Sequence, residues 1–294
     1  MSANKINSVL LIGGSGFLGL HLIEQFYRND STTKISVFDV RPLPEKLSKQ
    51  FTFDPKNIKF FRAFVYTSSA GVIFNGQDIH NADETWPIPE VPMDSYNETK
   101  AIAEDMVLKA NDPSSNFYTI ALRPAGIFGP GDRQLVPGLR SVAKLGQSKF
   151  QLGDNNNWFD WTYAGNVADA HVLAAEKLLN KDTASKASGE TYFITNDTPT
   201  YFWALARTVW KADGHIDKKV IVLNRPLAIF AGYLSEFFSK ILNKEPGLTP
   251  FRVKIVCAYR YHNISKAKEI LGYKPQVGIE EGIQKTLEWM DEGL

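Results

Sequence analysis

Tyr96 and Lys100 are the two residues of this sequence whose types and spacing best suit chemistry on an alcohol. They lie four positions apart in the segment SYNETK, so on a helix their side chains share one face. An ammonium beside a phenol stabilises the phenolate, and the phenol can then act as a general base for a hydroxyl proton. Because the chain holds 11 tyrosines, such a pair also arises by chance. The pair therefore predicts a base only where other elements position it.

Three glycines form a second chemical pattern, G-x-x-G-x-x-G, at Gly13, Gly16 and Gly19, with Phe17 and Leu18 between the last two. An apolar run precedes it and an amphipathic stretch follows, which is the order strand, turn, helix. Without side chains, such a turn lets a pyrophosphate approach the backbone N–H groups at the helix N-terminus. The pattern predicts a dinucleotide site. A tight turn without a ligand is the alternative.

Asp39 ends the next apolar run, twenty residues after Gly19. A carboxylate at this place can accept hydrogen bonds from both ribose hydroxyls of adenosine, and it repels a 2′-phosphate. We therefore expect NAD rather than NADP as the cofactor. Arg41 keeps NADP open as an alternative, because a guanidinium can pair with the extra phosphate.

The elements needed to position these residues follow from periodicity. The pattern predicts strands at 8–12, 34–40, 65–69, 117–122 and 192–195, and helices at 95–110, 201–210, 226–242 and 279–291. Strands that alternate with helices indicate an α/β fold with a doubly wound, parallel, Rossmann-like sheet. We expect residues 1–199 to form the NAD-binding domain, with 137–163 contributing to the substrate region. Residues 200–294 would form a smaller, mostly helical substrate-binding lid.

Composition excludes several classes of protein. The 33 Lys and Arg residues balance 32 Asp and Glu residues, so no overall field favours a nucleic acid. Cys257 is the single cysteine, which excludes an internal disulfide and favours a reducing compartment. The histidines show no spacing typical of a metal site, and we expect no metal. Neither a signal peptide nor a transmembrane span is predicted, although Pro226–Leu242 would present one apolar helix face.

At the level of whole motifs the sequence resembles the extended short-chain dehydrogenase/reductase family, and within it the 3β-hydroxysteroid dehydrogenase branch. The resemblance is carried by the glycine turn and by the segments VYTSSAGVIFNG, ETWPIP, YNETKAIAE, LRPAGIFGP, DWTYAGNVADAHVLAA and LGYKPQVGIEEGIQKTLEWM. It implies oxidation of the 3β-hydroxyl of a 4α-carboxysterol to a ketone with loss of CO₂, in ergosterol or related sterol biosynthesis.

The resemblance also implies residue roles. Tyr96 would be the base and would also contact the cofactor, and Lys100 would be its partner and the binder of the nicotinamide ribose. Ser69 would be the donor to the reacting oxygen, with Ser68 as the alternative. Pro124 and Ile127 would lie along the nicotinamide. His171 is predicted to be a helix residue packed on the sheet rather than a catalytic acid. We expect aromatic side chains to line a sterol pocket, with these candidates: Trp86, Trp158, Phe159, Trp161, Phe230, Tyr233 and Phe237.

Partners and location follow from the same resemblance. The family implies a sterol substrate, contact with other sterol C4-demethylation enzymes, a homodimer, and the cytoplasmic face of the endoplasmic reticulum. The apolar face of Pro226–Leu242 would either rest on a membrane leaflet or cover the sterol pocket. Alternatives are another extended short-chain dehydrogenase, such as a nucleotide-sugar epimerase or a different hydroxysteroid dehydrogenase, and a catalytically impaired chain that only binds partners.

The chain departs from the family between Asp39 and Ser69, where only thirty residues replace two strands, a crossover and a helix. The join falls in residues 57–69, where the start of one family strand runs into the end of another. An omitted segment, a gene model that lacks an exon and a genuinely shortened protein would each produce it. For a shortened protein we expect weak NAD binding and little turnover. If strand 65–69 took the free position beside the first strand, Ser69 would move by one strand spacing, about 4.8 Å.

Overall fold

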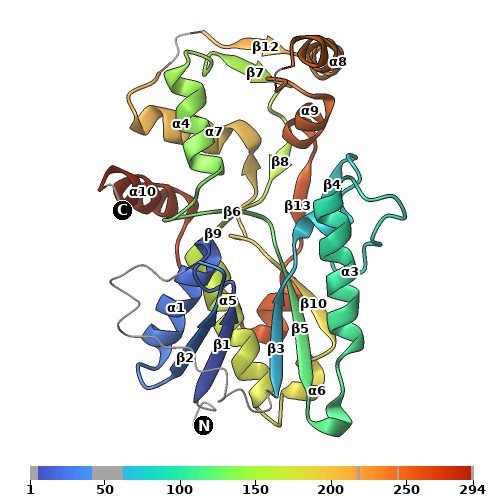
Figure 1. The fold of residues 1–294 in the computed structure, drawn as a ribbon, viewed down its shortest axis with the longest axis vertical. Coiled ribbons are helices and arrows are strands. Elements are labelled where there is room, and N and C mark those ends of the chain that lie inside the picture. Colours follow the sequence, from blue (N-terminus) through green and yellow to red (C-terminus); the bar gives the residue numbers. More distant parts are fainter. Residues whose placement is uncertain (1–5, 42–61, 217–218, 244, 293–294) are drawn as a thin grey trace.

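The computed structural model describes residues 6–41, 62–216, 219–243 and 245–292. Figure 1 shows an elongated molecule with the long parallel strands at one end and a cluster of helices at the other. Part of the predicted join, residues 57–61, lies outside the described residues.

The predicted doubly wound fold is confirmed for the N-terminal end, but its parallel strands form two sheets instead of one. Strands β1 (Ser8–Ile12) and β2 (Lys34–Phe38) pair with each other. Strand β5 (Tyr118–Pro124) pairs on one side with β3 (Ala63–Thr67) and on the other with β10 (Glu190–Ile194). Within the described residues, β1 and β3 are not hydrogen-bonded to each other. The strand near Ser69 therefore stays beside β5 and does not slide next to β1.

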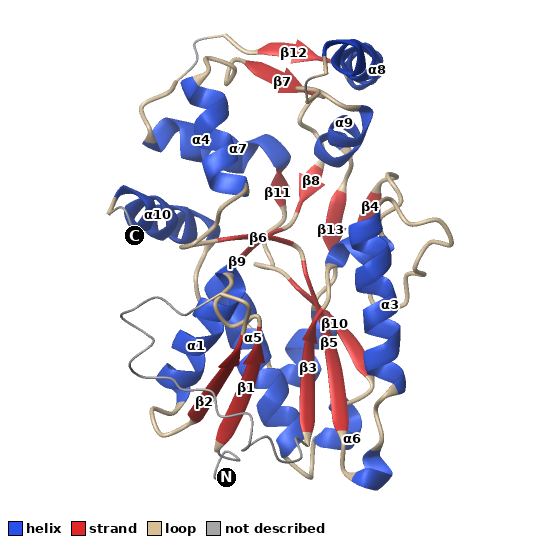
Figure 2. Ribbon diagram, in the orientation of Figure 1, coloured by secondary structure: helices blue, strands red, loops and turns tan. Residues whose placement is uncertain are grey.

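Helices cover these strands, as Figure 2 shows. Helices α1 (Phe17–Asn29) and α5 (Ala164–Leu179) pack together on one side. Helix α3 (Ser95–Lys109) packs on β5, and α6 (Ala184–Ala187) packs on α5. The largest core cluster includes Ile120 and Leu122 of β5 and Tyr192 of β10, all fully buried. A separate cluster, built around Leu11, Ile23 and Ile35, holds β1, β2 and α1 together.

The remaining elements are short strands and further helices, and most of them lie at the opposite end of the molecule (Figure 1). Their bounds are η2 (Ala70–Ile73), β4 (Ile79–Ala82), η3 (Pro113–Ser115), β6 (Gly126–Phe128), α4 (Leu135–Lys144), β7 (Phe150–Leu152), β8 (Trp158–Phe159), β9 (Trp161–Tyr163), β11 (Thr200–Tyr201), α7 (Phe202–Ala212), β12 (Ile221–Leu223), α8 (Arg225–Leu242), α9 (Pro250–Cys257), β13 (Arg260–His262), the π-helix η4 (Ala267–Leu271) and α10 (Ile279–Asp291). A small sheet with strand order β11-β8-β13-β4 joins segments far apart in the sequence. Helix α10 packs Ile283 and Leu287 against Phe128 and Tyr163. The limits of the two predicted domains remain a prediction.

His171 fixes α5 to the end of β3 in the way the sequence predicts. Its Nδ1–H donates to Val167 O at 2.8 Å, and its Nε2 accepts from the Thr67 hydroxyl at 2.7 Å. These two bonds require the neutral ring. Burial lowers the pKa of His171 to about 4.

A pH dependence of stability follows from this histidine. Its pKa lies near 6.5 in the unfolded chain and near 4 in the folded one, so unfolding takes up a proton between these values. The contribution is complete above pH 6.5 and declines as the pH falls, by about 2 kcal/mol at pH 5. Urea unfolding at pH 8 and pH 5 measures it. We expect His171→Gln to lose about 2 kcal/mol less than the parent chain over this interval, and equal losses would contradict the assignment.

Candidate active site

The glycine turn between β1 and α1 is tightly folded. Gly13 has φ +77°, which favours glycine, and its N–H donates to Phe38 O at 2.8 Å, so the turn is joined to β2. A Cβ atom on Gly19 would lie 2.5 Å from Gly13 O, a collision that backbone atoms cannot relieve easily. Two of the three predicted glycines are therefore required by the shape of the turn itself.

The same turn leaves a place for an anion. Helix α1 begins at Phe17 after the cap residue Gly16, and no side chain of the described residues caps its first N–H groups. Such unsatisfied groups, together with the helix dipole, favour a phosphate. A Cβ atom on Gly13 would meet nothing within 4 Å, so the space beside the turn is open. These features fit the pyrophosphate of a dinucleotide.

Asp39 lies against this turn, as the sequence predicts. Its carboxylate accepts from Ser15 N at 3.0 Å and from Arg41 N at 2.9 Å, while Arg41 Nε lies 3.8 Å away. The backbone N–H of Arg41 is the main cause that lowers the pKa of Asp39. An ionised carboxylate is thus held beside the glycine turn, with the Arg41 guanidinium next to it.

Helix α1 also contacts the segment that contains Pro124 and Ile127. His21 Nε2–H donates to Pro130 O at 2.8 Å, and the Phe17 ring packs edge-on against His21. Leu18 packs against the main core cluster. Pro124 ends β5 and Ile127 lies in β6, so the structure brings the loop after these two residues to the helix of the glycine turn.

Lys100 projects from α3 to the carboxyl end of β3. The helix begins at Ser95, where the Asp94 carboxylate accepts from Asn97 N at 2.7 Å. Lys100 Nζ donates to Thr67 O at 2.8 Å and lies 5.1 Å from the centre of the Tyr66 ring. Burial lowers the pKa of Lys100. The ammonium therefore sits two residues from Ser69, at the edge of the sheet.

The two candidate serines differ in accessibility. Ser69 is half-buried, and its Oγ accepts from Gly71 N at 3.0 Å. Ser68 is buried, and its Oγ has no hydrogen-bond partner among the described residues. A Cβ atom on Gly71 would collide with Asn97 Oδ1, so this buried amide packs against the Ser69 turn. The sequence analysis missed Asn97, although it directly follows Tyr96.

Tyr96 lies on the exposed side of α3, with 57% of its surface accessible. Within the part of the chain that the structure describes, its hydroxyl makes no hydrogen bond. Burial raises the pKa of the neighbouring Tyr66, with smaller contributions from Glu104 and Tyr96. Two phenols and Lys100 therefore lie near the end of β3, and Tyr96 is the more exposed of the two phenols.

Glu104 and Arg123 anchor α3 to β5. Arg123 Nε donates to Glu104 Oε2 at 3.0 Å, and its Nη2 donates to Oε1 at 2.5 Å. Both side chains are at most 5% exposed. The sequence analysis missed this ion pair. The spacing of Glu104, four residues after Lys100, places both side chains on one helix face but does not indicate Arg123 as the partner.

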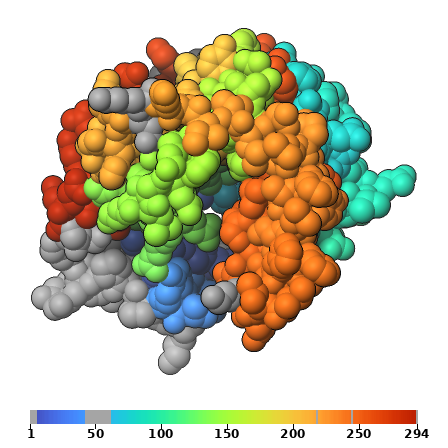
Figure 3. Space-filling model, turned by 90° about the horizontal axis from the view of Figure 1, so that it is seen from above, coloured from blue at the N-terminus to red at the C-terminus, as the bar shows by residue number. Residues whose placement is uncertain are grey.

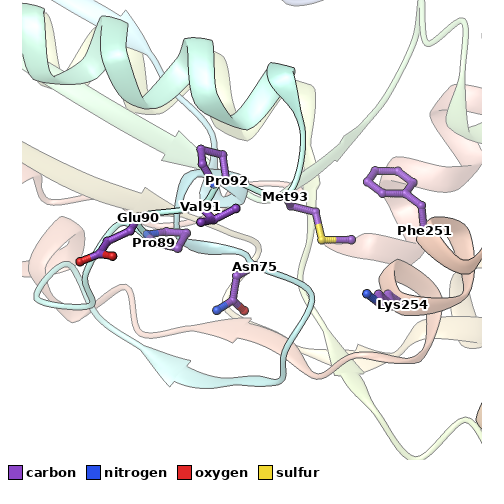
Figure 4. A pocket seen from close by; sticks show the side chains of 8 residues that line it. All are labelled: Asn75, Pro89, Glu90, Val91, Pro92, Met93, Phe251 and Lys254. Atoms are coloured by element: carbon purple, nitrogen blue, oxygen red, sulfur yellow. The ribbon is translucent and has the colours of Figure 1, made fainter.

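A cavity of about 680 Å³ opens beside the start of α3. Figure 4 shows its side chains, which come from the segment before α3, from α9 and from the loop after η2: Asn75, Pro89, Glu90, Val91, Pro92, Met93, Phe251 and Lys254. Most of them are apolar, as in sites for apolar ligands of this size. None of the seven predicted aromatic residues lines this cavity. Phe159 and Trp161 are instead buried in the core.

Comparison with known sequences shows the family of this chain. The sequence profile of the 3-beta hydroxysteroid dehydrogenase/isomerase family matches residues 10–62 and 57–225. The chain belongs to this family. Among the described residues, no group of three His, Cys, Asp or Glu side chains could hold a metal ion.

Members of the 3-beta hydroxysteroid dehydrogenase/isomerase family with assigned activities are similar over nearly their whole length. The chain is 68% identical to the sterol-4-alpha-carboxylate 3-dehydrogenase, decarboxylating, of Saccharomyces cerevisiae, covering 99% of this chain and 100% of that protein. The protein of the same name from Candida albicans is 60% identical, over 99% of this chain and 100% of that one.

Solved structures share the fold of this family member at low identity. The UDP-glucose 4-epimerase of Thermotoga maritima aligns with TM-score 0.69 and 17% identity, covering 97% of this chain and 99% of that one. The dTDP-glucose 4,6-dehydratase of Bacillus anthracis, in complex with NAD, aligns with TM-score 0.68 and 16% identity, covering 97% and 96%.

The predicted internal gap also has support. The two matched pieces of the family profile overlap at residues 57–62, inside the predicted join. The alignment with the S. cerevisiae protein spans 348 positions, whereas this chain has 294 residues, so at least 54 positions (348 − 294) have no counterpart here.

Proposed function

We propose that this chain oxidises the 3β-hydroxyl of a 4α-carboxysterol to a ketone with NAD, in sterol biosynthesis, and that CO₂ is lost from the product. The observation that carries the proposal is the 68% identity to the S. cerevisiae sterol-4-alpha-carboxylate 3-dehydrogenase over that whole protein. The backbone of the glycine turn and the side chains of Ser69, Tyr96 and Lys100 supply groups suited to this reaction. The low-identity epimerase structures support the shared fold alone.

The proposed reaction assigns separate roles to residues of this chain. The turn at Gly13, Gly16 and Gly19, with Phe17 and Leu18, would hold the pyrophosphate of NAD, and Asp39 the adenosine ribose. Pro124, Ile127 and Lys100 would hold the nicotinamide end. NAD, when bound, supplies the hydride acceptor. Ser69 donates a hydrogen bond to the substrate oxygen, and Tyr96 takes the hydroxyl proton as the C–H bond gives up its hydride.

Loss of CO₂ needs no further base. Oxidation at C3 leaves a carboxylate on the carbon next to a carbonyl. When the C–CO₂ bond breaks, its electron pair moves toward the carbonyl oxygen, which gives an enolate that then takes a proton. Ser69 would donate a hydrogen bond to that oxygen as its negative charge develops. The apolar cavity beside α3 would receive the sterol body.

Turnover of a 4α-carboxysterol tests the proposal. The 294-residue chain is incubated with the carboxysterol and millimolar NAD, and NADH, the 3-ketone and CO₂ are measured. We expect the three products in equal amounts. A matched sterol with a 3β-hydroxyl but no carboxylate should yield ketone without CO₂. If a UDP-sugar is converted to its epimer without net NADH, and neither sterol yields NADH, the epimerase alternative replaces this one.

The preference for NAD over NADP is a prediction about Asp39. Replacing Asp39 by Ala removes the acceptor of the ribose hydroxyls and a charge that repels a 2′-phosphate, while Arg41 remains. We expect the association constant for NADP, divided by that for NAD, to rise roughly tenfold to a hundredfold. The reason is that a hydrogen bond to a charged group contributes ~1.5–3 kcal/mol. Isothermal titration with both cofactors measures it. Arg41→Ala is the control and should lower the ratio. An unchanged ratio in Asp39→Ala would refute this role.

The apolar face of α8 supports a peripheral membrane contact, and the resemblance to the family supports the endoplasmic reticulum as the location. Only Ala228 and Gly232 of this helix are buried, and Gly232 packs closely on Pro250. The exposed apolar residues are Leu227, Phe230, Tyr233, Leu234, Phe237, Phe238, Ile241 and Leu242. Figure 3 views this end of the molecule, with the segment that includes α8 in orange. None of these apolar α8 residues lines the cavity beside α3, which weighs against the alternative that α8 covers that cavity. No helix in the described ranges is long and apolar enough to cross a membrane.

A double substitution tests this contact. Phe230 and Phe237 are both 60% exposed, and their change to Ser should weaken binding to vesicles at least tenfold, since burying one such side chain contributes ~1.5–3 kcal/mol. Co-sedimentation with vesicles of phosphatidylcholine and phosphatidylinositol measures the change. Ile102→Ser with Met106→Ser, at similarly exposed places on α3, is the matched control and should bind like the parent chain. Equal loss in both double variants, or in neither, would exclude α8 as the contact.

A further inference from the structure

Two parallel strands, β1 and β3, each have one edge without a partner strand among the described residues. Strand β1 pairs only with β2, and β3 pairs only with β5. Figure 1 shows that both strands run in the same direction on the same side of α5. In a doubly wound sheet the first strand lies in the middle, with a strand on each side. Among the described residues, no strand therefore occupies the place on the free side of β1.

The backbone register shows which groups face this place. Lys34 N donates to Asn7 O and Gly13 N to Phe38 O, so the alternate residues Leu10 and Ile12 direct their amide groups away from β2. On the other sheet Ser68 N donates to Leu122 O and Tyr118 N to Arg62 O. By the same alternation, Ala63 and Val65 direct their amide groups away from β5. Two rows of strand N–H and C=O groups thus border the place.

Burial agrees with an unfilled position. Strand β5, paired on both sides, is buried from Thr119 to Pro124. No residue of β3 is fully buried, and Phe64 is 38% exposed. On β1, Ile12 is 71% exposed. Strands inside a parallel sheet are normally buried on both faces, and an exposed apolar edge pairs readily with another strand.

Helix α5 covers one face behind both sheets. Its residues Val172, Ala175 and Leu179 belong to the cluster around β1, β2 and α1. Its residues Val167, Ala170 and Ala174 belong to the main cluster around β5 and β10. The bond between Thr67 and His171 fixes the helix to β3. An incoming strand would thus meet an apolar layer that is already in place.

The relatives indicate what fills it. At least 54 positions of the S. cerevisiae protein have no counterpart in this chain, and the family profile breaks at residues 57–62, between β2 and β3. We propose that the edges of β1 and β3 bind, as a parallel strand between them, the segment that this relative carries at the break, even when that segment is a separate polypeptide. Its binding would join β1 and β3 into one continuous sheet. The glycine turn follows β1 and Lys100 contacts the end of β3, so both would lie at the same edge of that sheet. The effect on NAD rests on the proposed function, but the strand pairing does not.

The experiment uses the 294-residue chain and, as a separate polypeptide, the stretch of the S. cerevisiae protein that aligns between residues 57 and 62. Native mass spectrometry and titration measure association, and cofactor fluorescence measures NAD binding. We expect a one-to-one complex with a dissociation constant of about 10 μM or tighter, as for other added strands. Without the segment NAD should bind more weakly than micromolar, and with it at least roughly tenfold more tightly. A scrambled segment is the control.

Edge variants distinguish strand pairing from other binding. Val65→Pro removes an N–H that faces the unfilled place and spares the ladder to β5, so it should abolish association, whereas Val65→Ala should retain it. In the parent complex, hydrogen exchange at Leu10 and Val65 should slow by at least about tenfold. This last measurement holds even where Val65→Pro fails to fold. No association at 100 μM, or association without protection of these two amides, overturns the proposal. Absent sterol turnover with normal association would overturn only the proposed function.

Discussion

Replacing Tyr96 by Phe should lower kcat for the carboxysterol by a factor of about 10² to 10⁴, the usual contribution of a general base. The substitution removes only the hydroxyl of a side chain that is 57% exposed at the start of α3, so folding and NAD affinity should stay unchanged. The initial rate of NADH formation at saturating carboxysterol and millimolar NAD measures the effect. It is expressed as a ratio to the parent chain, so a low absolute rate does not obscure it.

Tyr66→Phe is the matched control for this prediction. Tyr66 lies 5.1 Å from Lys100 Nζ, but burial raises its pKa, which makes it a poor base near neutral pH. Its variant should keep the rate within about threefold. If Tyr66→Phe loses the activity and Tyr96→Phe retains it, the roles of the two phenols are reversed.

Glu104→Gln should destabilise the chain by about 3–5 kcal/mol, because it leaves the Arg123 guanidinium buried without its charged partner. Urea unfolding at pH 8, followed by far-UV circular dichroism, measures the change in the free energy of unfolding. The helix that carries Tyr96 and Lys100 is anchored to β5 by this pair, so activity should decline as well. An exposed pair on the same helix, Lys109 with Asp105, gives the comparison. Asp105→Asn should cost less than about 1 kcal/mol.

The double variant Glu104→Leu with Arg123→Met separates charge from packing. It removes both charges and keeps apolar volume, so it should recover most of the stability that Glu104→Gln loses. If the double variant is as unstable as the single one, shape rather than the unpaired charge explains the loss. If Glu104→Gln changes the free energy of unfolding by less than 1 kcal/mol, the pair is not an anchor.

Local patterns predicted the strongly periodic elements well. The first strand, Ser8–Ile12, and the helix Ile279–Asp291 are confirmed to the residue, and the helix predicted over 95–110 ends one residue early. These elements have apolar periodicity or a glycine turn at their ends. The strands β4, β8, β11 and β13 could not be predicted in the same way, because they are two to four residues long and exist only through pairing with distant segments.

In the candidate site, too, features of short segments could be predicted and contacts between distant segments could not. The glycine turn, Asp39 and the spacing of Tyr96 and Lys100 are properties of short segments, and they could be identified from residue types alone. The bond from Lys100 to Thr67 O and the Glu104–Arg123 pair join a helix to separate strands, so no local pattern contains them. The predicted aromatic pocket was wrong for the cavity beside α3, because burial of Phe159 and Trp161 depends on packing between distant segments.

The division of the parallel strands into two sheets has a consequence for cooperativity. The unit of β1, β2 and α1 has its own core cluster and contacts the rest mainly through α5 and the His21–Pro130 bond. Because most of its contacts with the rest pass through α5, we expect its amides to exchange through a local opening of lower free energy than the global unfolding that urea measures. A dinucleotide that touches both parts would then act as a thermodynamic link, and the melting of one part would become coupled to the melting of the other.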